Sequence, residues 1–200
     1  LIKSDRGPTT RVEAGSIVGA TNLEIDRWVD WLLRDQVTGF KTATFYLAEP
    51  GNEASAGTNN SRAYFGHLPT LDQYVTVLPG GRAPSDAALD VPGGPLTLEG
   101  LVPREAADEF GVGVGDTLAA IPFWNDSTPY AHVVISGLFE RNDPGDEFWH
   151  IFDKIFQSST TGNFRTVPFL VTEPAYFEVL GQAFKKMNST YGWLLAVDRS

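Results

Sequence analysis

Three histidines, His67, His132 and His150, are the residues of this sequence best suited to acid–base or metal chemistry. His132 falls within a predicted strand, where a histidine more often belongs to the core or to a sheet face than to a catalytic site. His67 precedes a turn at Leu68-Pro69 and has no carboxylate near it in the sequence. Neither of these two positions by itself predicts a catalyst.

His150 is the stronger candidate, because Asp146, Glu147 and Asp153 all lie within one helical turn of it. The spacing Glu147-x-x-His150 matches one half of a carboxylate-bridged metal motif, which needs a second copy that this sequence lacks. Acidic residues early in a helix and a histidine later also complement the helix dipole. A solvated helix face is therefore the plainer interpretation.

No longer motif adds a reactive centre. The sequence has no cysteine, which excludes thiol catalysis, disulfides and cysteine-ligated metals. Catalytic-serine, zinc-protease and phosphate-loop motifs are absent as well. Gly111-Val112-Gly113-Val114-Gly115 has the glycines of a dinucleotide loop but follows a predicted helix, whereas that loop must follow a strand. The motifs therefore give no positive evidence of an enzyme, although an active site can assemble from residues distant in the sequence. We expect no catalytic residue, no cofactor and no metal.

The composition indicates one domain of residues 1–200, or two small lobes that share a core. Hydrophobic residues make up 42% and aromatic residues 12% of the 200 positions, enough to bury a sizeable core. The formal net charge of −10 argues against a nucleic-acid partner and against docking on an anionic membrane surface. No apolar run approaches the roughly 20 residues that span a bilayer. The start at Leu1 fits a fragment or a processed chain.

A first helix is predicted over 22–36, because Thr21 and Glu24 have capping-box spacing and an apolar stripe follows them. The stripe consists of Ile25, Trp28, Val29, Leu32 and Leu33. The dense Thr, Phe and Tyr residues of 40–47 predict a strand. The segment 49–60 offers so little to bury that we expect an exposed, mobile loop.

Turn residues and apolar periodicity divide the rest of the chain into short elements. Prolines and glycines leave no room for a regular element over 79–95, and Pro103 and Gly111 bracket a short helix. Further strands are predicted at 62–65, 73–78, 96–102, 118–124, 130–139, 166–171 and 191–197, and further helices from Pro144 onward and over 174–186. This order predicts an α+β fold with a mixed, largely antiparallel sheet and several short helices.

Phrases between Leu78 and Glu140 follow an order that resembles a known family. They are Leu78-Pro79-Gly80-Gly81-Arg82-Ala83-Pro84, Leu98-Glu99-Gly100-Leu101-Val102, the run from Ala106 to Leu118, and His132-Val133-Val134-Ile135-Ser136-Gly137-Leu138-Phe139. The order is similar to that of the extracytoplasmic (periplasmic core) domain of MacB/FtsX-type ABC transporter permeases. Thr166 to Phe184 fits the family loosely, and 1–67 matches only its general helix-then-strand character.

The resemblance implies a MacB-type periplasmic core fold and a non-catalytic role. In such permeases this domain is inserted between the first two transmembrane helices, and it couples cytoplasmic ATP hydrolysis to substrate export or to the regulation of a partner. The implied partners are a cytoplasmic ATPase subunit, a second permease copy, and an extracytoplasmic adaptor or substrate. The implied location is the periplasmic or extracellular side of the plasma membrane. The two chain ends should then lie close together, since both return to the membrane.

Four aromatic residues are candidates for contacts with such a partner, because aromatic side chains often dominate interface energies. They are Phe123, Trp124, Tyr130 and Trp149, for which burial in the core is the more ordinary role. Two other functions stay open. A secreted or periplasmic hydrolase would need a cleft that gathers a histidine and a carboxylate with shifted pKa values. A soluble ligand-binding module could use the loop 49–60 as a lid.

Overall fold

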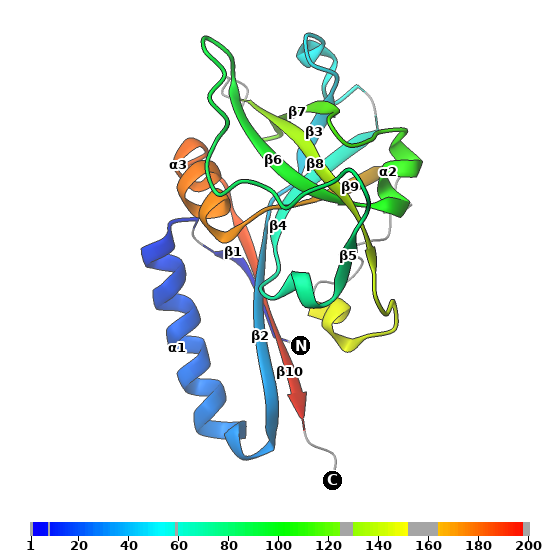
Figure 1. The fold of residues 1–200 in the computed structure, drawn as a ribbon. Helices are drawn as coiled ribbons and strands as arrows, with labels where there is room; N and C mark the ends of the chain where they lie inside the picture. Colours follow the sequence, from blue (N-terminus) through cyan, green and yellow to red (C-terminus); the bar gives the residue numbers. More distant parts are fainter. Residues whose placement is uncertain (1, 8, 59, 125–129, 152–163, 198–200) are drawn as a thin grey trace.

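The computed structural model describes residues 2–7, 9–58, 60–124, 130–151 and 164–197 of the chain. It confirms an α+β fold with one mixed sheet and a few helices (Figure 1). The strands are β1 (Ile2–Gly7), β2 (Leu33–Thr42), β3 (Phe45–Ala48), β4 (Ser61–His67), β5 (Val75–Val77), β6 (Leu96–Pro103), β7 (Thr117–Pro122), β8 (Ala131–Arg141), β9 (Arg165–Leu170) and β10 (Ser189–Val197). The α-helices are α1 (Arg11–Val29), α2 (Arg104–Phe110) and α3 (Gly181–Ala183). The short 3₁₀ helices are η1 (Asp30–Leu32), η2 (Glu53–Ser55), η3 (Leu71–Gln73) and η4 (Glu147–Ile151), and η5 (Ala175–Leu180) is a π-helix that leads into α3.

Six of the strands close into a barrel-like sheet. Their order is β4, β3, β7, β8, β6 and β9, and the parallel pairing of β9 with β4 closes the ring. The pairing of β6 with β8 is also parallel, whereas the other strand pairs described are antiparallel. Side chains on these strands form the centre of the main core, including the fully buried Phe45, Phe65, Leu98, Val133 and Phe169.

Strands β2, β10 and β1 extend the sheet beyond the barrel. β2 joins the barrel through its last residues, where Phe40 pairs with His67 of β4. β2 and β10 then pair along their whole length, from Ser189 opposite Thr42 to Val197 opposite Leu33. Helix α1 lies alongside this extension in Figure 1, so the molecule has a wide upper body and a narrower lower part.

Helix α1 begins eleven residues before the predicted start at 22. Its N-cap is Thr10, whose hydroxyl accepts a hydrogen bond from the backbone N–H of Glu13. The residues that cap this helix are therefore Thr10 and Glu13, and the predicted pair of Thr21 and Glu24 lies inside the helix.

The predicted end of this helix was also wrong, because Leu33 to Gln36 belong to strand β2. The backbone N–H and C=O groups of these residues form hydrogen bonds with β10. A local sequence pattern does not reveal this pairing, because β10 lies far away in the chain. The apolar stripe is correspondingly only partly buried. Ile25 is buried, but the side chain of Trp28 is 68% exposed.

In the middle of the chain, the helix limits predicted from proline and glycine agree closely with the structure. α2 begins directly after Pro103 and ends at Gly111, whose φ of 67° is the left-handed conformation of a helix C-cap. Beyond it, the backbone N–H of Gly113 donates to the Asp116 carboxylate at 2.7 Å, which forms a tight turn before β7. β7 and β8, which correspond to the strands predicted over 118–124 and 130–139, pair antiparallel.

The last predicted helices are shorter than expected. The segment 174–186 is helical only from Ala175 to Ala183, so Lys185 and Lys186 lie in a turn beyond it. After Pro144 the structure has the short turn η4, and residues 152–163 of the predicted helix lie outside the described residues. Among the helices described, none is both long and apolar enough to span a bilayer.

Candidate functional site

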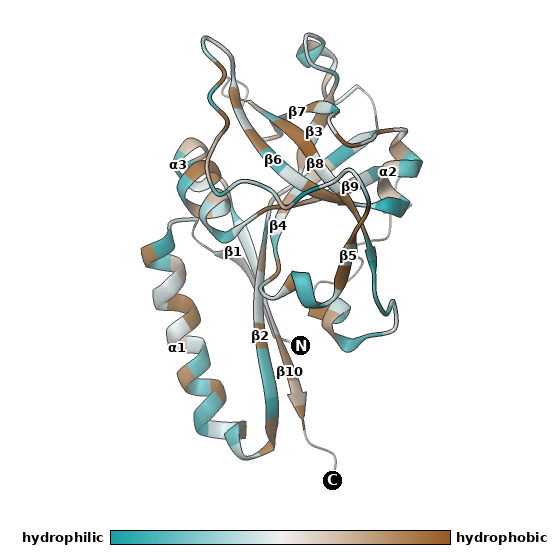
Figure 2. Ribbon diagram, in the orientation of Figure 1, coloured by the Kyte–Doolittle hydropathy of each residue, from teal (hydrophilic) through white to brown (hydrophobic). Residues whose placement is uncertain are grey.

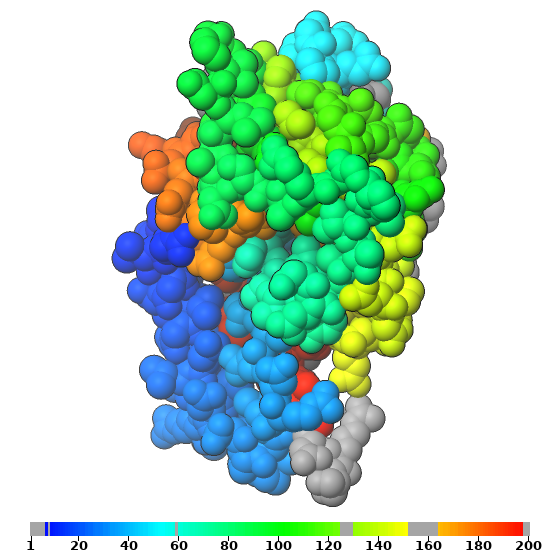
Figure 3. Space-filling model, viewed as in Figure 1, coloured from blue at the N-terminus to red at the C-terminus, as the bar shows by residue number. Residues whose placement is uncertain are grey.

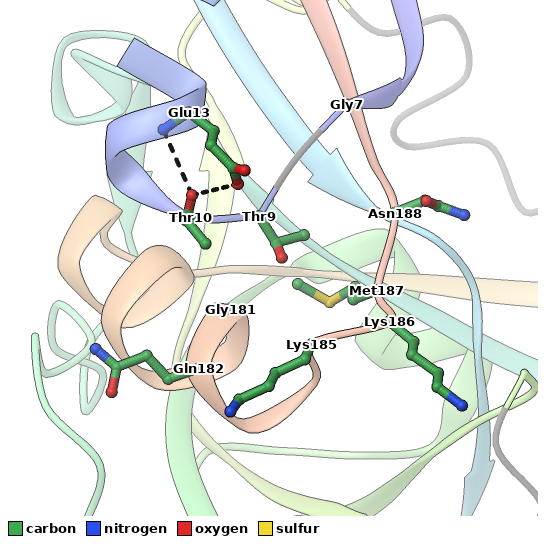
Figure 4. Close-up of a pocket in the computed structure, with 10 residues that line it drawn as sticks. All are labelled: Gly7, Thr9, Thr10, Glu13, Gly181, Gln182, Lys185, Lys186, Met187 and Asn188. Atoms are coloured by element: carbon green, nitrogen blue, oxygen red, sulfur yellow. Dashed lines mark hydrogen bonds between the residues drawn. The ribbon is translucent and has the colours of Figure 1, made fainter. Parts of the chain in front are cut away.

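A cavity of about 890 Å³ lies between the start of α1 and the turn that follows α3 (Figure 4). Its lining brings together chain segments that are more than 170 residues apart, since Gly7 and Thr10 line it together with Lys186 and Asn188. The two walls are held close by Gly181. A Cβ atom on that residue would lie 2.1 Å from the backbone oxygen of Thr9, so only glycine permits the contact.

The polar groups of this cavity are not arranged as a catalytic centre. The Glu13 carboxylate already accepts a hydrogen bond from the Thr10 hydroxyl at 2.6 Å. Figure 4 shows the side chains of Lys185 and Lys186 pointing away from each other and from Glu13. The cavity therefore offers helix-capping groups and separate ammonium groups, which could at most attract an anion loosely.

A second cavity, of about 390 Å³, lies where α2 ends against the barrel. Arg165 lines it, and its guanidinium donates to the backbone oxygen of Glu109 at 3.1 Å and lies 5.0 Å from the Phe110 ring. The Asp116 carboxylate, also on the wall, accepts the Gly113 N–H. Arg165 and Asp116 thus hold the end of α2 and the turn that follows it, and Glu49 is the third charged residue that lines the cavity.

His67 lies half-buried at the junction of β4 and β2. Its Nδ1 atom is 3.1 Å from the carbonyl oxygen of Val171, and its ring stacks on Phe40 at a centroid distance of 5.0 Å. Burial is the main cause that lowers the pKa of His67 below its ordinary value, and the nearby Arg11 acts in the same direction. The hydrogen bond to Val171 and the charge of Glu173 oppose this shift. A neutral histidine that donates to a carbonyl serves the fold at this junction.

His132 is the histidine that the described structure places beside a carboxylate. Its Nε2 atom lies 3.5 Å from Oε1 of Glu53, which belongs to the predicted loop 49–60. The pKa of Glu53 is lowered, chiefly by the backbone N–H of Gly51, which donates to the carboxylate. Neither residue is among those that line the two cavities.

His150 lies on η4 with an exposed side chain. No group of three or more potential metal ligands occurs among the residues that the structure describes. The solvated face that the sequence favoured is consistent with this position, and Asp153 lies outside the described residues.

Residues from the phrases that resemble the permease family meet in one cluster. Glu99 of β6 is almost completely buried, and its carboxylate accepts hydrogen bonds from both terminal nitrogens of Arg82. The backbone N–H of Ser85 donates to the same carboxylate at 3.0 Å. The segment 79–85, which contains no helix or strand, is thereby fixed to the barrel.

The same segment crosses β8 at a pair of glycines. A Cβ atom on Gly81 would lie 2.7 Å from Cα of Gly137, and one on Gly137 would lie 2.9 Å from the side chain of Leu101. The Arg82 N–H donates to the carbonyl of Ser136, beside a bulge in the β6–β8 pairing. The two glycines allow the segment 79–85 to pass close over β8, and the Arg82–Glu99 ion pair holds the segment in this position.

The four aromatic residues proposed as partner contacts differ in exposure. Phe123 is 52% exposed, while Trp124 and Tyr130 are half-buried. The Trp124 ring packs edge-on against Phe45 of the core. Trp149 is only 7% exposed, and its Nε1–H donates to the backbone oxygen of Asp143 at 2.8 Å. Phe123 is thus the member whose position suits a contact with a partner.

Two exposed tryptophans were missed as surface residues. Trp28 is 68% and Trp31 80% exposed, and they lie at the end of α1 and in η1. Figure 2 shows hydrophobic positions at intervals along α1, and the stripe in the sequence placed Trp28 on its buried side. No sequence signal separates the two sides of this helix, because apolar residues occur all around it.

Comparison with protein-family models, with curated proteins and with solved structures finds no match to this chain.

Proposed function

We propose that this chain is a non-catalytic extracytoplasmic domain of a MacB/FtsX-type ABC transporter permease. In this role it couples ATP hydrolysis by a cytoplasmic subunit to substrate export, or to the regulation of a partner outside the membrane. A second permease copy and an adaptor or substrate would be its further partners.

The observation that carries the proposal is the relative position of the first and last strands. β1 and β10 are antiparallel neighbours, with Ile2 opposite Trp193 and Gly7 opposite Ser189. The described chain therefore enters at Ile2, beside Trp193 of β10, and leaves at Val197, four residues further along the same strand. A domain inserted between two membrane helices requires this arrangement, since both ends must return to the same surface.

The architecture also supports a mechanical role. β2 and β10 run from the lower end to the barrel as a ladder of nine paired residues. A displacement applied to β1 and β10 would reach the barrel through this ladder, since hydrogen-bonded networks and rigid secondary elements carry coupling between distant sites. The loops that carry η2 and the turns of 79–95 project at the opposite end, where a partner would be met (Figure 1).

The proposal is tested first by reading the coding sequence on both sides of this chain. We expect one membrane-spanning helix before Leu1 and three more after Ser200. A cleavable signal immediately before Leu1, with a stop codon shortly after Ser200, would refute the permease and favour a free secreted protein.

A labelling experiment on intact cells tests the location independently. Because the chain has no cysteine, A54C in the exposed turn η2 introduces a single thiol into this domain. A membrane-impermeant maleimide should label this thiol in the full-length protein without permeabilising the plasma membrane. Labelling only after permeabilisation would contradict an extracytoplasmic location.

A further inference from the structure

The corner where α1 turns into β2 carries an exposed apolar surface. It consists of Trp28, Trp31 and Val197, which are 68%, 80% and 42% exposed. Val197 belongs to it because β10 ends opposite Leu33, two residues after Trp31. We call this surface the α1–β2 corner. Large apolar side chains that remain exposed together often mark a contact with another phase or another molecule.

We propose that the α1–β2 corner contacts the lipid headgroup region of the bilayer from which the domain emerges. This inference rests on the proposed function, since it takes β1 and β10 as the connections to membrane segments. Beyond that function, the inference identifies the surface that contacts the membrane and the orientation of the domain on it.

The first argument is the position of the corner relative to the chain ends. β10 runs from the barrel toward the corner, and its last residue, Val197, pairs with Leu33, two residues after Trp31. In Figure 3 the light-blue segment that joins α1 to β2 forms part of the lower edge of the molecule. A membrane segment connected to β10 would therefore bring the bilayer to this corner rather than to the barrel.

The second argument is the chemistry of the side chains. Tryptophan has an apolar ring and a polar N–H, and it is enriched at the interface between bilayer and water. Trp28 already has the mixed surroundings of such an interface. Its Nε1–H donates to Glu24 at 3.2 Å, and the Arg27 guanidinium lies 5.5 Å from its ring.

The charge of the corner defines the kind of lipid contact. Residues 24–35 contain four carboxylates and two arginines, a net charge of −2. Attraction to anionic lipid is therefore not the driving force, and the contact depends on the tryptophan rings and on the connection to the membrane. A tether supplies the high effective concentration that makes such a weak contact persist.

The geometry then places the barrel away from the lipid. α1 has 19 residues, which corresponds to a length of about 28 Å at about 1.5 Å per residue. The corner lies at the C-terminal end of this helix, whereas the cavity of Figure 4 lies at its N-terminal end. The extension would thus hold the barrel and its loops clear of the headgroups.

The test uses the 200-residue chain attached to phosphatidylcholine vesicles by a histidine tag added after Ser200 and bound to nickel-chelating lipid. Lipids brominated near the headgroup quench tryptophan fluorescence on contact. We expect quenching of the wild-type protein and its loss in the double variant W28F/W31F, which keeps the other three tryptophans. Unchanged thermal unfolding of the variant would confirm that it folds.

A matched control attaches the same chain from the other end. A54C, coupled to a maleimide lipid, places η2 at the vesicle surface, and we then expect no quenching that depends on Trp28 and Trp31. Replacing part of the neutral lipid with phosphatidylglycerol should not strengthen the contact of the tagged protein.

Three results would overturn the inference: no quenching through the tag, equal quenching from both attachment points, or equal quenching of the wild type and W28F/W31F. A blue shift of Trp28 and Trp31 emission with protein concentration in the absence of vesicles would instead assign the corner to a second copy of the chain. Failure of this test leaves the permease proposal intact, because that proposal is decided by the flanking sequence and by labelling of A54C in cells.

Discussion

Arg82 and Glu99 form an ion pair between a segment with no regular structure and a strand of the barrel. The Glu99 side chain is 3% exposed, whereas that of Arg82 is 64% exposed and covers it. Removing the arginine would leave a buried carboxylate with the Ser85 N–H as the one remaining donor of the three that now bind it. The pair therefore explains why residues 79–85 hold a fixed path across the sheet.

The first prediction concerns this pair. R82A should lower the free energy of unfolding by about 1.5–3 kcal/mol, because an almost buried charge loses its partner. The same substitution in an E99Q background should cost at least about 1 kcal/mol less, since the uncharged amide needs no cation. Urea unfolding of the four proteins in this cycle measures the difference. Strictly additive effects would show that the two side chains are not coupled.

The second prediction concerns the contact of Gly181 with Thr9. G181A should destabilise the protein by about 1–3 kcal/mol, since the new methyl group collides with a backbone oxygen that cannot rotate away. The φ of Gly181 is −62°, so alanine is otherwise acceptable there. The matched control is G19A in α1, where no atom lies within 4 Å of the added Cβ.

G19A should stabilise the protein by about 0.5–1 kcal/mol, as alanine does in a helix interior. Thermal and urea unfolding compare the two variants. Equal effects of G181A and G19A would mean that the closeness of Thr9 to Gly181 has no energetic consequence.

The third prediction concerns pH and His67. The pKa of His67 is lowered in the folded protein, so the unfolded chain binds a proton more readily. Stability should therefore fall as the pH drops below the unfolded-state pKa of about 6.5, and this loss is complete only below the folded-state pKa. H67Q removes this titration, so its stability should change less than that of the wild type between about pH 7 and the folded-state pKa.

Two measurements check this prediction. An NMR titration should give His67 a pKa below 6.5 in the folded protein. Chemical unfolding at several pH values should show the smaller pH dependence of H67Q. A folded-state pKa above 6.5 would reverse the sign and show that the hydrogen bond to Val171 and the charge of Glu173 together outweigh burial.

The fourth prediction separates the buried from the exposed aromatic candidates. W149A should cost about 3–5 kcal/mol, because it empties a core position and removes the hydrogen bond to Asp143. F123A should change stability by less than about 1 kcal/mol, since half of its side chain is in solvent. Urea unfolding measures both. Unchanged stability of W149A with lost binding of a partner would instead make Trp149 a contact residue.

The sequence by itself determined the elements whose limits depend on neighbouring residues. Pro103 and Gly111 define α2, and the prolines and glycines of 79–95 exclude any helix there. These features could be predicted because backbone conformation at proline, glycine and turn residues depends on contacts within a few positions. The α+β class followed from the order of such elements.

Among candidate sites, the sequence singled out histidines and aromatic residues but could not place them in the fold. His67 has a backbone carbonyl 104 positions away as its partner, and His132 meets Glu53 across 79 positions. Trp28 and Trp149 have the same residue type and opposite exposures. The local sequence pattern does not show which face of a helix or strand packs against a segment that is distant in the chain.

Only the tertiary structure decided the closure of the barrel, the true limits of α1 and the position of the chain ends. Pairing of β4 with β9 joins residues about 100 positions apart, and pairing of β2 with β10 turns Leu33–Gln36 from a predicted helix into a strand. The Arg82–Glu99 pair and the corner of Trp28, Trp31 and Val197 depend on the same long-range contacts. Hydrogen-bond ladders between distant segments outweigh the modest local preference for helix, which differs by less than about 1 kcal/mol per residue among ordinary residues.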